Sequence, residues 1–386
     1  MTRRVLVARL DSAGDVLISG PAIRAVAAQP DVEVTVLAGP QGAAAARLLP
    51  GVDRVLTWAA PWIVDPAPAV SDARLDELAE LLADVDPEEA VILTSFHQSP
   101  LPLALLLRLA GVVRITGASV DYAGSLLDVR LRPGETLDED QPEPERARRI
   151  AEAAGFASPA GDDGRLAVEP GEAARAAAVA LLAETVGDAP FVVVHPGAAV
   201  PSRAWSVDRN RETVEALASA GWIVVVTGAA AEAPLARAVA GRVGVDLSGR
   251  TDLGVLAVVL ERAAAVVTGN TGPAHLAAAV GTPVVSLFSP VVPASRWAPY
   301  GVPVVLLGDQ SAACRGSRAR ECPVAGHPCL TGVTAADAAE AVTRLAGRPG
   351  RHGLEEATRA SSAPLRTRPR TTAGASRPIE SEEAAR

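Results

Sequence analysis

The chain has 386 residues, enough for two domains of ordinary size, and 49% of them are hydrophobic. Its net charge of −9 argues against nucleic-acid binding, because a nucleic-acid-binding protein needs a basic face to neutralise phosphates. No secretory signal is evident, and the apolar run 101–113 contains Arg108 and is too short to span a bilayer. We expect a soluble, cytoplasmic protein and leave peripheral membrane contact open.

The first 130 residues alternate between short apolar runs and segments that favour helices. The apolar runs predict strands at 5–10, 33–38, 54–57, 90–94 and 113–116. The intervening segments predict helices near 16–29, 41–49, 72–83 and 101–109. The strands are mostly continuous β-branched runs, which is typical of a parallel sheet covered by helices on both faces.

The pattern changes between residues 132 and 188. The acidic, proline-rich stretch 133–145 predicts an exposed loop, and helices are expected around 146–155 and 171–186. A second alternating half follows, with strands expected at 191–195, 222–227, 245–247, 264–268, 283–288 and 303–307.

Two α/β halves in series predict two Rossmann-like domains that face each other across a cleft. We place them at 1–165 and 166–346. The remaining residues, 347–386, have almost no large apolar side chains, so they are predicted to form a disordered tail.

Three turns that follow predicted strands carry most of the functional signal. The first is Ser12-Ala-Gly-Asp15, and the second is His195-Pro-Gly197, with Arg203 and Trp205 beyond it. The third, Asn270-Thr-Gly-Pro-Ala-His275, opens a helix with proline in its first turn. Free backbone N–H groups at such a helix start favour a phosphate or diphosphate.

In this order the three turns resemble those of glycosyltransferase family 9, the heptosyltransferase-like enzymes. The family has S-x-G-D after its first strand, then H-P-G with a basic residue two before tryptophan, then D-[ST]-G-x-x-H. The resemblance runs from about residue 3 to 345. It implies a GT-B fold, with the acceptor on the first domain and the nucleotide on the second.

The resemblance also implies a reaction. A sugar, heptose-like as in lipopolysaccharide core biosynthesis, moves with inversion from a nucleotide-diphosphate donor such as ADP-heptose to a hydroxyl of a glycan or glycolipid. No cofactor is expected. Two alternative functions stay open: a nucleotide-sugar epimerase with the same two-domain fold, and a nucleotide-sugar binding protein without catalytic activity.

Asp15 matches the family's proposed base, which would deprotonate the acceptor hydroxyl. From spacing alone, an aspartate at a helix start more often caps or charges the helix. Asp11 lies in the same turn. Its charge could raise the pKa of Asp15, but a hydrogen bond within the turn is the more frequent role of such a residue.

The donor side is expected to hold its anion without a metal. Arg203 stands where the family commonly has lysine, and its planar fork can bind a diphosphate. Thr271 and Gly272 form the helix-start anion site, and His275 either reaches the phosphates or packs against the sheet. Asn270 replaces the family's aspartate, where the resemblance implies contact with the transferred sugar, so the sugar's identity is in doubt.

Four further residues complete the expected site. Glu232 matches an acidic residue that can bind ribose hydroxyls, although an exposed helix-start glutamate is an equal alternative. Thr251 is a candidate for the base pocket. His97 and Gln98 follow a strand end in the first domain, so they could touch the acceptor.

Three cysteines cluster with His327 in one loop: Cys314, Cys322 and Cys329. Their spacing does not match the common zinc patterns, and an odd number argues against a structural disulfide. We expect a structural loop, with metal binding as the minor alternative.

Overall fold

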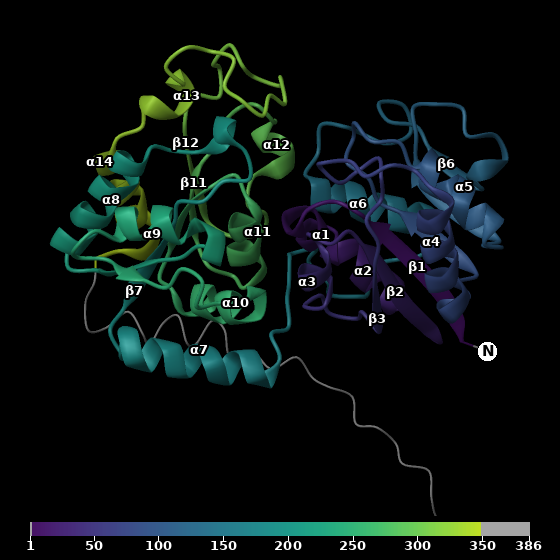
Figure 1. Ribbon diagram of the computed structural model, residues 1–386, viewed down its shortest axis with the longest axis horizontal. Helices are drawn as coiled ribbons and strands as arrows, with labels where there is room; N and C mark the ends of the chain where they lie inside the picture. The colour runs from purple at the N-terminus through teal and green to yellow at the C-terminus, as the bar shows by residue number, and fades with distance from the viewer. Residues whose placement is uncertain (1, 349–386) are drawn as a thin grey trace, which may run out of the picture. The chain divides into compact units, whose positions relative to one another are not determined.

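The computed structural model describes residues 2–348, which form two parallel sheets, each with helices packed on it (Figure 1). The predicted tail lies outside the described residues from position 349 onward. Among residues 2–348, no helix is both long and apolar enough to cross a membrane.

The first sheet has six parallel strands in the order β3-β2-β1-β4-β5-β6. They are β1 (Arg3–Arg9), β2 (Val32–Ala38), β3 (Arg54–Thr57), β4 (Glu89–Ile92), β5 (Arg114–Ala118) and β6 (Val129–Leu131). The central strand β1 pairs with β2 and β4, so the carboxyl ends of all three lie at one edge. The turns after these strands are where open parallel sheets bind ligands.

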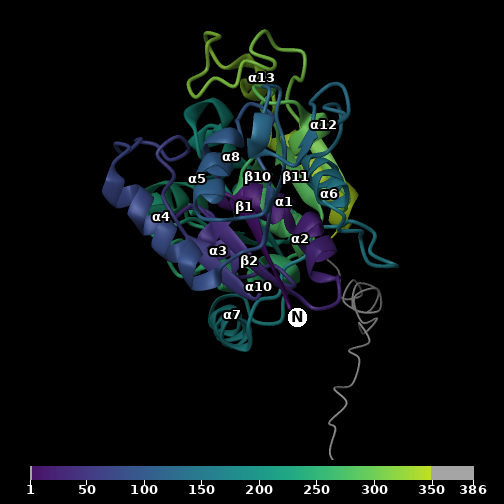
Figure 2. The same cartoon turned by 90° about the vertical axis from the view of Figure 1, so that its right-hand side faces the viewer.

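Helices cover both faces of this sheet. They are α1 (Ala13–Ile18), α2 (Gly20–Ala27), α3 (Ala43–Ala46), α4 (Asp72–Val85), α5 (Leu101–Leu109) and α6 (Glu143–Ala153). Val5 and Val7 of β1 are buried with α1, α2 and α6, whereas Leu6 and Ala8 are buried with α4 and α5. Figure 2 shows these two groups of helices on opposite sides of β1. The alternation of side chains along one apolar strand therefore builds two cores.

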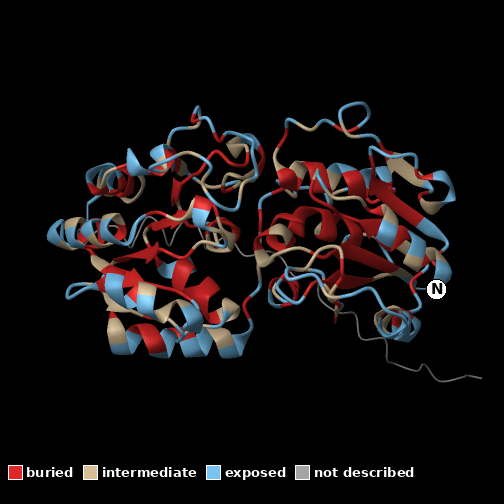
Figure 3. Ribbon diagram, turned by 45° about the horizontal axis from the view of Figure 1, so that its top comes forward, coloured by how far each residue is buried: buried red, intermediate tan, exposed pale blue. Residues whose placement is uncertain are grey.

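The second sheet has the parallel order β12-β11-β10-β7-β8-β9. Its strands are β7 (Phe191–His195), β8 (Ile223–Val226), β9 (Val245–Asp246), β10 (Val266–Gly269), β11 (Val284–Leu287) and β12 (Val304–Leu307). Thr268 pairs with His195, so the turns after β7 and β10 lie side by side. The central strands of both sheets, such as β7, β10 and β11, are buried, whereas the edge strands are partly exposed (Figure 3).

The second sheet is also covered on both faces. Its main helices are α7 (Glu172–Thr185), α8 (Val207–Ser219), α9 (Ala233–Ala240), α10 (Leu253–Arg262), α11 (Gly272–Ala279) and α14 (Ala335–Ala346), with short α12 (Ala294–Trp297) and α13 (Pro328–Thr331). Val193 is buried with α7 and α10, and Val192 and Val194 with α8, α9 and α14. The predicted boundary at 165/166 lies between α6 and α7 and remains a prediction.

Three parts of the chain differ from what its sequence predicts. The sequence predicts no strand at β6 (Val129–Leu131), which completes the first sheet. The predicted helix 16–29 is divided into α1 and α2 at Ser19, just before Pro21, which has no N–H to continue the helical hydrogen bonds. The predicted exposed loop 133–145 is wrong in its second part. α6 already begins at Glu143, which is 2% exposed because Arg296 neutralises its charge.

α1 of the first half packs directly on α11 of the second, and two glycines make this approach possible. A Cβ on Gly14 would lie 3.3 Å from the Gly272 Cα and 3.2 Å from the His275 Cδ2. Both distances are shorter than ordinary contacts. Glycine at position 14 thus brings the first turns of α1 and α11, and the polar residues on them, to one place.

Candidate active site

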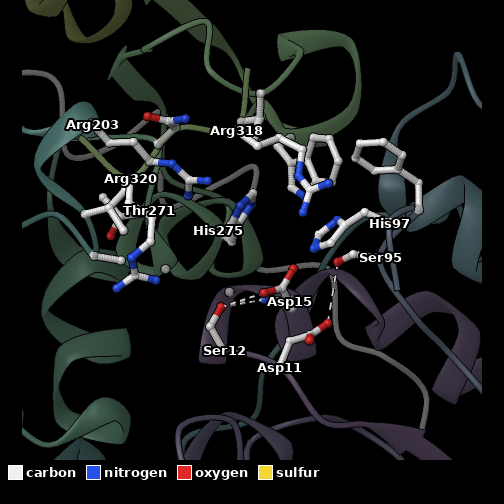
Figure 4. A pocket seen from close by; sticks show the side chains of 18 of the residues that line it. Asp11, Ser12, Asp15, Ser95, His97, Arg203, Thr271, His275, Arg318 and Arg320 are labelled. Atoms are coloured by element: carbon white, nitrogen blue, oxygen red, sulfur yellow. Dashed lines mark hydrogen bonds between the residues drawn. The ribbon is translucent and has the colours of Figure 1, made fainter. Parts of the chain in front are cut away.

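A cavity of about 410 Å³ lies at the carboxyl edges of both sheets. Its walls include eight of the ten predicted site residues: Asp15, His97, Gln98, Arg203, Asn270, Thr271, Gly272 and His275. Figure 4 shows Asp15 on one side, Arg203 and Thr271 on the other, and His275 between them. The arrangement is what a reaction between two bound substrates needs, because acid–base and anion-binding groups face the same space.

Asp15 lies in the first turn of α1, but it is not the residue that caps this helix. The N-cap is Ser12, whose hydroxyl accepts a bond from the Asp15 amide at 3.5 Å. The Asp15 carboxylate instead accepts hydrogen bonds from Arg9 at 3.0 Å and from the Ser12 hydroxyl at 2.7 Å. It is therefore oriented at the cavity wall by two donors.

These donors also keep Asp15 ionised. Burial acts to raise the pKa of Asp15, but the charge of Arg9 and the hydrogen bond from Ser12 outweigh it and lower this pKa below its ordinary value. Asp15 can thus accept a proton at neutral pH without first losing one.

Asp11 corrects the expectation of a hydrogen bond within the turn. Its carboxylate forms an ion pair with the Arg9 Nε at 3.0 Å and accepts hydrogen bonds from Gln98 and, at 3.5 Å, from Ser95. The pKa of Asp15 is lowered overall, whereas burial and the like charge of Asp15 act to raise the pKa of Asp11. Asp11 instead ties the turn after β1 to the turn after β4.

The turn after β4 carries His97 and Gln98, the two residues predicted to contact the acceptor, and their environments differ. Gln98 lines the cavity, but its amide is engaged by Asp11. His97 is more exposed, and partial burial together with the charge of Arg318 lowers its pKa to about 4, so its ring is neutral at physiological pH. Phe96, which was not predicted, packs edge-on against His97 with ring centres 5.3 Å apart.

The opposite wall is built by the turns after β7 and β10. Thr271 is the N-cap of α11, yet its side chain makes no capping bond. Pro273 has no N–H and the Ala274 amide donates to the Thr271 carbonyl at 3.0 Å, so the amide at the helix start that can meet another acceptor is that of Gly272. The Nε of Arg203 and the Nδ1 of His275 are buried without a hydrogen-bond partner among residues 2–348. Burial lowers the pKa of His275 to about 4. Donors and amides of this kind suit an anion.

Asn270 is 5% exposed and lies between this wall and the β11 turn. Its Nδ2 donates to the Ser289 carbonyl at 3.5 Å, while its Oδ1 is buried without a partner in the described part of the chain. A ligand hydroxyl would satisfy that oxygen, in keeping with the predicted contact to the sugar.

The two remaining predicted residues lie elsewhere. Glu232 and Thr251 line an adjoining cavity of about 370 Å³ that shares Thr271 with the first. Glu232 also accepts the Ala229 amide at 2.8 Å, so it both closes a helix start and faces the cavity. The Glu232 carboxylate packs directly against Gly197, and a Cβ at that position would displace it.

All three cysteines are free thiols, with Cys314 and Cys329 buried. Between residues 2 and 348, no group of three or more histidine, cysteine or acidic side chains is arranged to hold a metal ion. His327 has a structural role instead, because its ring forms a hydrogen bond with the Ser202 carbonyl at 3.0 Å.

Sequence reasoning missed several residues of the site. Arg9 has a signal in hindsight, since an arginine at the end of an apolar strand and just before two aspartates is unusual. Phe96, Trp297 and Arg318 also line the cavity, but they come from loops whose positions local sequence does not reveal.

Two Rossmann-like sheets with a shared cavity at their carboxyl edges form a GT-B fold. The chain belongs to glycosyltransferase family 9 (heptosyltransferase), whose model matches residues 98–326. The predicted family and fold are thereby confirmed, and with them the prediction of an enzyme that transfers a sugar. No curated protein sequence matches the chain.

Solved structures share the fold at low sequence identity. A family 9 glycosyltransferase from Veillonella parvula is 18% identical with a TM-score of 0.71, and covers 89% of this chain and 97% of its own. The E. coli ADP-heptose lps heptosyltransferase II is 20% identical with a TM-score of 0.67, covering 89% and 98%. E. coli heptosyltransferase WaaC, solved with ADP-2-deoxy-2-fluoro heptose, is 21% identical with a TM-score of 0.63, covering 88% and 99%.

Proposed function

We propose that this enzyme transfers a heptose-like sugar from an ADP-heptose-like donor to a hydroxyl of a glycan or glycolipid, with inversion. The observation that carries the proposal is the cavity in which Asp15 faces Arg203, His275 and the start of α11. E. coli WaaC, of the same fold, was solved with ADP and with a fluorinated ADP-heptose, which is why this donor class is chosen.

In this mechanism the acceptor hydroxyl attacks the anomeric carbon while Asp15 takes its proton. The bond from that carbon to the diphosphate breaks, and negative charge develops on the leaving group. Arg203 and the free amide at the start of α11 stabilise this charge in a partly buried site, where such interactions are strong. A single displacement inverts the anomeric configuration and needs only one base. Asp11, the second carboxylate of this turn, is bonded to Arg9 and Gln98 and is assigned no part in the proton transfer.

The nucleoside is assigned to the adjoining cavity. Glu232 would accept hydrogen bonds from the ribose hydroxyls, and Thr251 would line the base pocket. Thr271, which borders both cavities, marks where the diphosphate would pass from one to the other. Asn270 would then contact the sugar. The three free thiols are typical of a reducing compartment, and we place the reaction in the cytoplasm.

The proposal is tested by a thermal-shift screen of the full chain with ADP-, GDP-, UDP- and dTDP-sugars. A specific donor raises the melting temperature by mass action, and we expect ADP-heptose to give the largest shift. Transfer is then followed with that donor and candidate glycans, and the anomeric configuration of the product is read by NMR. Conversion of the donor without an acceptor would indicate an epimerase, and binding without any conversion a non-catalytic protein.

The same assay tests the role of metal. Because Arg203 and the free amide at the start of α11 would stabilise the leaving diphosphate, activity is expected to survive EDTA. Strict dependence on added magnesium or manganese would overturn this mechanism.

A further inference from the structure

Two arginines flank the ring of Phe96 at the cavity wall, and they differ in how their charge is compensated. The Arg296 guanidinium lies 4.4 Å from the ring centre and that of Arg318 lies 5.5 Å from it. Arg296 is buried and pairs with Glu143 and, at 2.8 Å, with Glu139. Arg318 is exposed, lines the cavity and forms no ion pair within residues 2–348.

The loop that carries Arg318 is held in place by its backbone. The Arg318 amide donates to the Val291 carbonyl at 2.8 Å, and Ser202 binds the carbonyls of Ala319 and Arg320 at 2.6 and 2.9 Å. Ser202 is fully buried and directly precedes Arg203. The loop is thus fixed to the same turn that presents the arginine of the donor side.

Arg318 also adopts an unusual backbone conformation. Its φ is 57°, in the left-handed region that non-glycine residues rarely occupy. Such strain persists only where surrounding contacts enforce it, and it is found most often at functional sites. Here the enforced conformation turns the guanidinium into the cavity, where Figure 4 shows it above His97.

The buried cysteines account for the anchoring of this loop. Cys314 and Cys329 are each 1% exposed and belong to the core of the second half, together with Leu330. They lie on either side of Arg318 in the sequence, so both ends of the segment are rooted in that core. The cysteine-rich loop is therefore anchored in the core of the second half at both ends, and it carries a side chain that reaches across to the first half.

The other positive charges around the cavity already have partners or a proposed ligand. Asp11 and Asp15 share Arg9, and Arg320 pairs with Asp65 at 3.2 Å. Arg203 is assigned to the donor diphosphate. Among the described residues of this wall, Arg318 is the arginine that has neither an ion pair nor an assigned ligand, and it lies beside the turn after β4, on the side of the cavity assigned to the acceptor.

We propose that Arg318 is a specificity-determining residue that binds an anionic group of the acceptor, a carboxylate or a phosphate, close to the hydroxyl that Asp15 deprotonates. This inference rests on the proposed function. A planar guanidinium held in advance by its loop binds either group through paired hydrogen bonds. The adjacent rings of Phe96 and Trp297, 5.7 Å apart, provide an apolar surface for the sugar that carries the group.

The test uses three small probes with the same pyranose scaffold: glucuronate, glucose 6-phosphate and glucose. Each is titrated by NMR into the full-length protein saturated with ADP. For the wild type we expect at least one charged probe to bind about tenfold more tightly than glucose, the scale of one charge-assisted interaction. Comparing the two charged probes shows whether the site prefers a carboxylate or a phosphate.

Three variants separate the possible outcomes. Arg318→Gln should remove the tenfold preference, and Arg318→Lys should retain part of it. Arg315→Gln is the matched control, because Arg315 is an exposed arginine of the same loop that does not line the cavity, and it should change nothing. Affinity for ADP should stay within about twofold in all three, since their side chains are not assigned to the diphosphate.

The proposal is overturned if the wild type does not prefer a charged probe, or if Arg318→Gln keeps the preference. It is equally overturned if Arg318→Gln weakens ADP binding, which would assign Arg318 to the donor phosphates. Absence of ADP binding in the wild type counts against the proposed function instead. The probes are therefore also titrated without ADP, where the preference for a charged probe still reports on Arg318.

Discussion

Both sheets have the same strand order when the strands of each half are counted from its own first strand, yet the turns after their strands differ in charge. In the first half these turns carry Asp11 and Asp15 around Arg9. In the second half they carry Arg203, His275 and the uncapped start of α11. One scaffold thus supplies a base on one side and an anion site on the other, and the chemistry depends on the turns rather than on the sheet.

The two sides of the cavity also differ in whether their buried polar groups have partners. Arg9 is 2% exposed, but its charge is met by two carboxylates. Arg203 and His275 have buried nitrogens with no partner in the described residues. The carboxylates of the first side are paired with Arg9, whereas the second side has donors that an incoming anion would satisfy. This difference leads to four predictions.

Asp15→Asn should have the largest effect. Turnover should fall by about two to four orders of magnitude, as is typical for loss of a general base, while ADP affinity stays near that of the wild type. Steady-state kinetics and calorimetry measure the two quantities. Asp208→Asn is the matched control, because Asp208 lies in the first turn of α8 and forms only an exposed ion pair. Suppose that both variants keep the turnover of the wild type and that their free energy of unfolding falls by only about a few tenths of a kcal/mol. Asp15 would then stabilise the start of the helix and take no part in the reaction.

His275 should make the protein less stable in acid. Its pKa is lowered from 6.5 to about 4 in the folded state, because burial disfavours the charged ring. Below pH 6.5 the unfolded chain therefore binds a proton that the folded chain does not, so stability decreases as the pH falls towards 4. The contribution is about 3 kcal/mol between about pH 7 and pH 4, at roughly 1.4 kcal/mol per pKa unit.

The measurement is urea unfolding of the wild type and of His275→Gln at several pH values. The wild type should lose more stability than the variant as the pH falls. Identical pH dependence in both would mean that the ring of His275 is protonated in the folded protein. Burial also lowers the pKa of His195. Because His195 is present in both proteins, its contribution to the pH dependence cancels in the comparison.

How far the sequence predicts each half follows from the range of the interactions involved. Strands such as β7 and helices such as α4 are encoded locally, by apolar runs and by spacing, and the structure has them close to where they were expected. The turns at Asp15 and Asn270 could be located because they follow such strands. Local pattern is therefore enough for the scaffold and for the positions of the main candidates.

Contacts between distant segments could not be predicted in this way. Gln98 engages Asp11 across the edge of the sheet, and Arg318 reaches the cavity from a loop of the other half. The acidic stretch at 139–143 has the composition of an exposed loop, yet Arg296, 153 positions after Glu143, neutralises it in a buried pair. Composition alone carries no information about a partner so far along the chain.

Arg203→Ala should weaken the binding of ADP by roughly 2 kcal/mol, or about thirtyfold, the scale of a hydrogen bond to a charged group. Adenosine, which lacks the diphosphate, should bind as it does to the wild type. Calorimetric titration of both ligands makes the comparison. Arg209→Ala is the control, since Arg209 forms an exposed pair with Glu212 on α8. An equal loss for adenosine and ADP would remove Arg203 from the phosphate site.

Asn270→Asp should have the smallest effect and should separate sugar recognition from phosphate binding. The amide of Asn270 donates to the Ser289 carbonyl and leaves its Oδ1 to a ligand hydroxyl. Aspartate cannot donate to that carbonyl, so the side chain should turn and change which sugar hydroxyl it meets. The order of kcat/KM among ADP-sugars should then change by several-fold, about 1 kcal/mol, with ADP affinity preserved. A fixed order with weaker ADP binding would place Asn270 at the phosphates or in support of the turn. In that case the anion site would extend to Asn270, and the sugar would have to be recognised mainly from the first half.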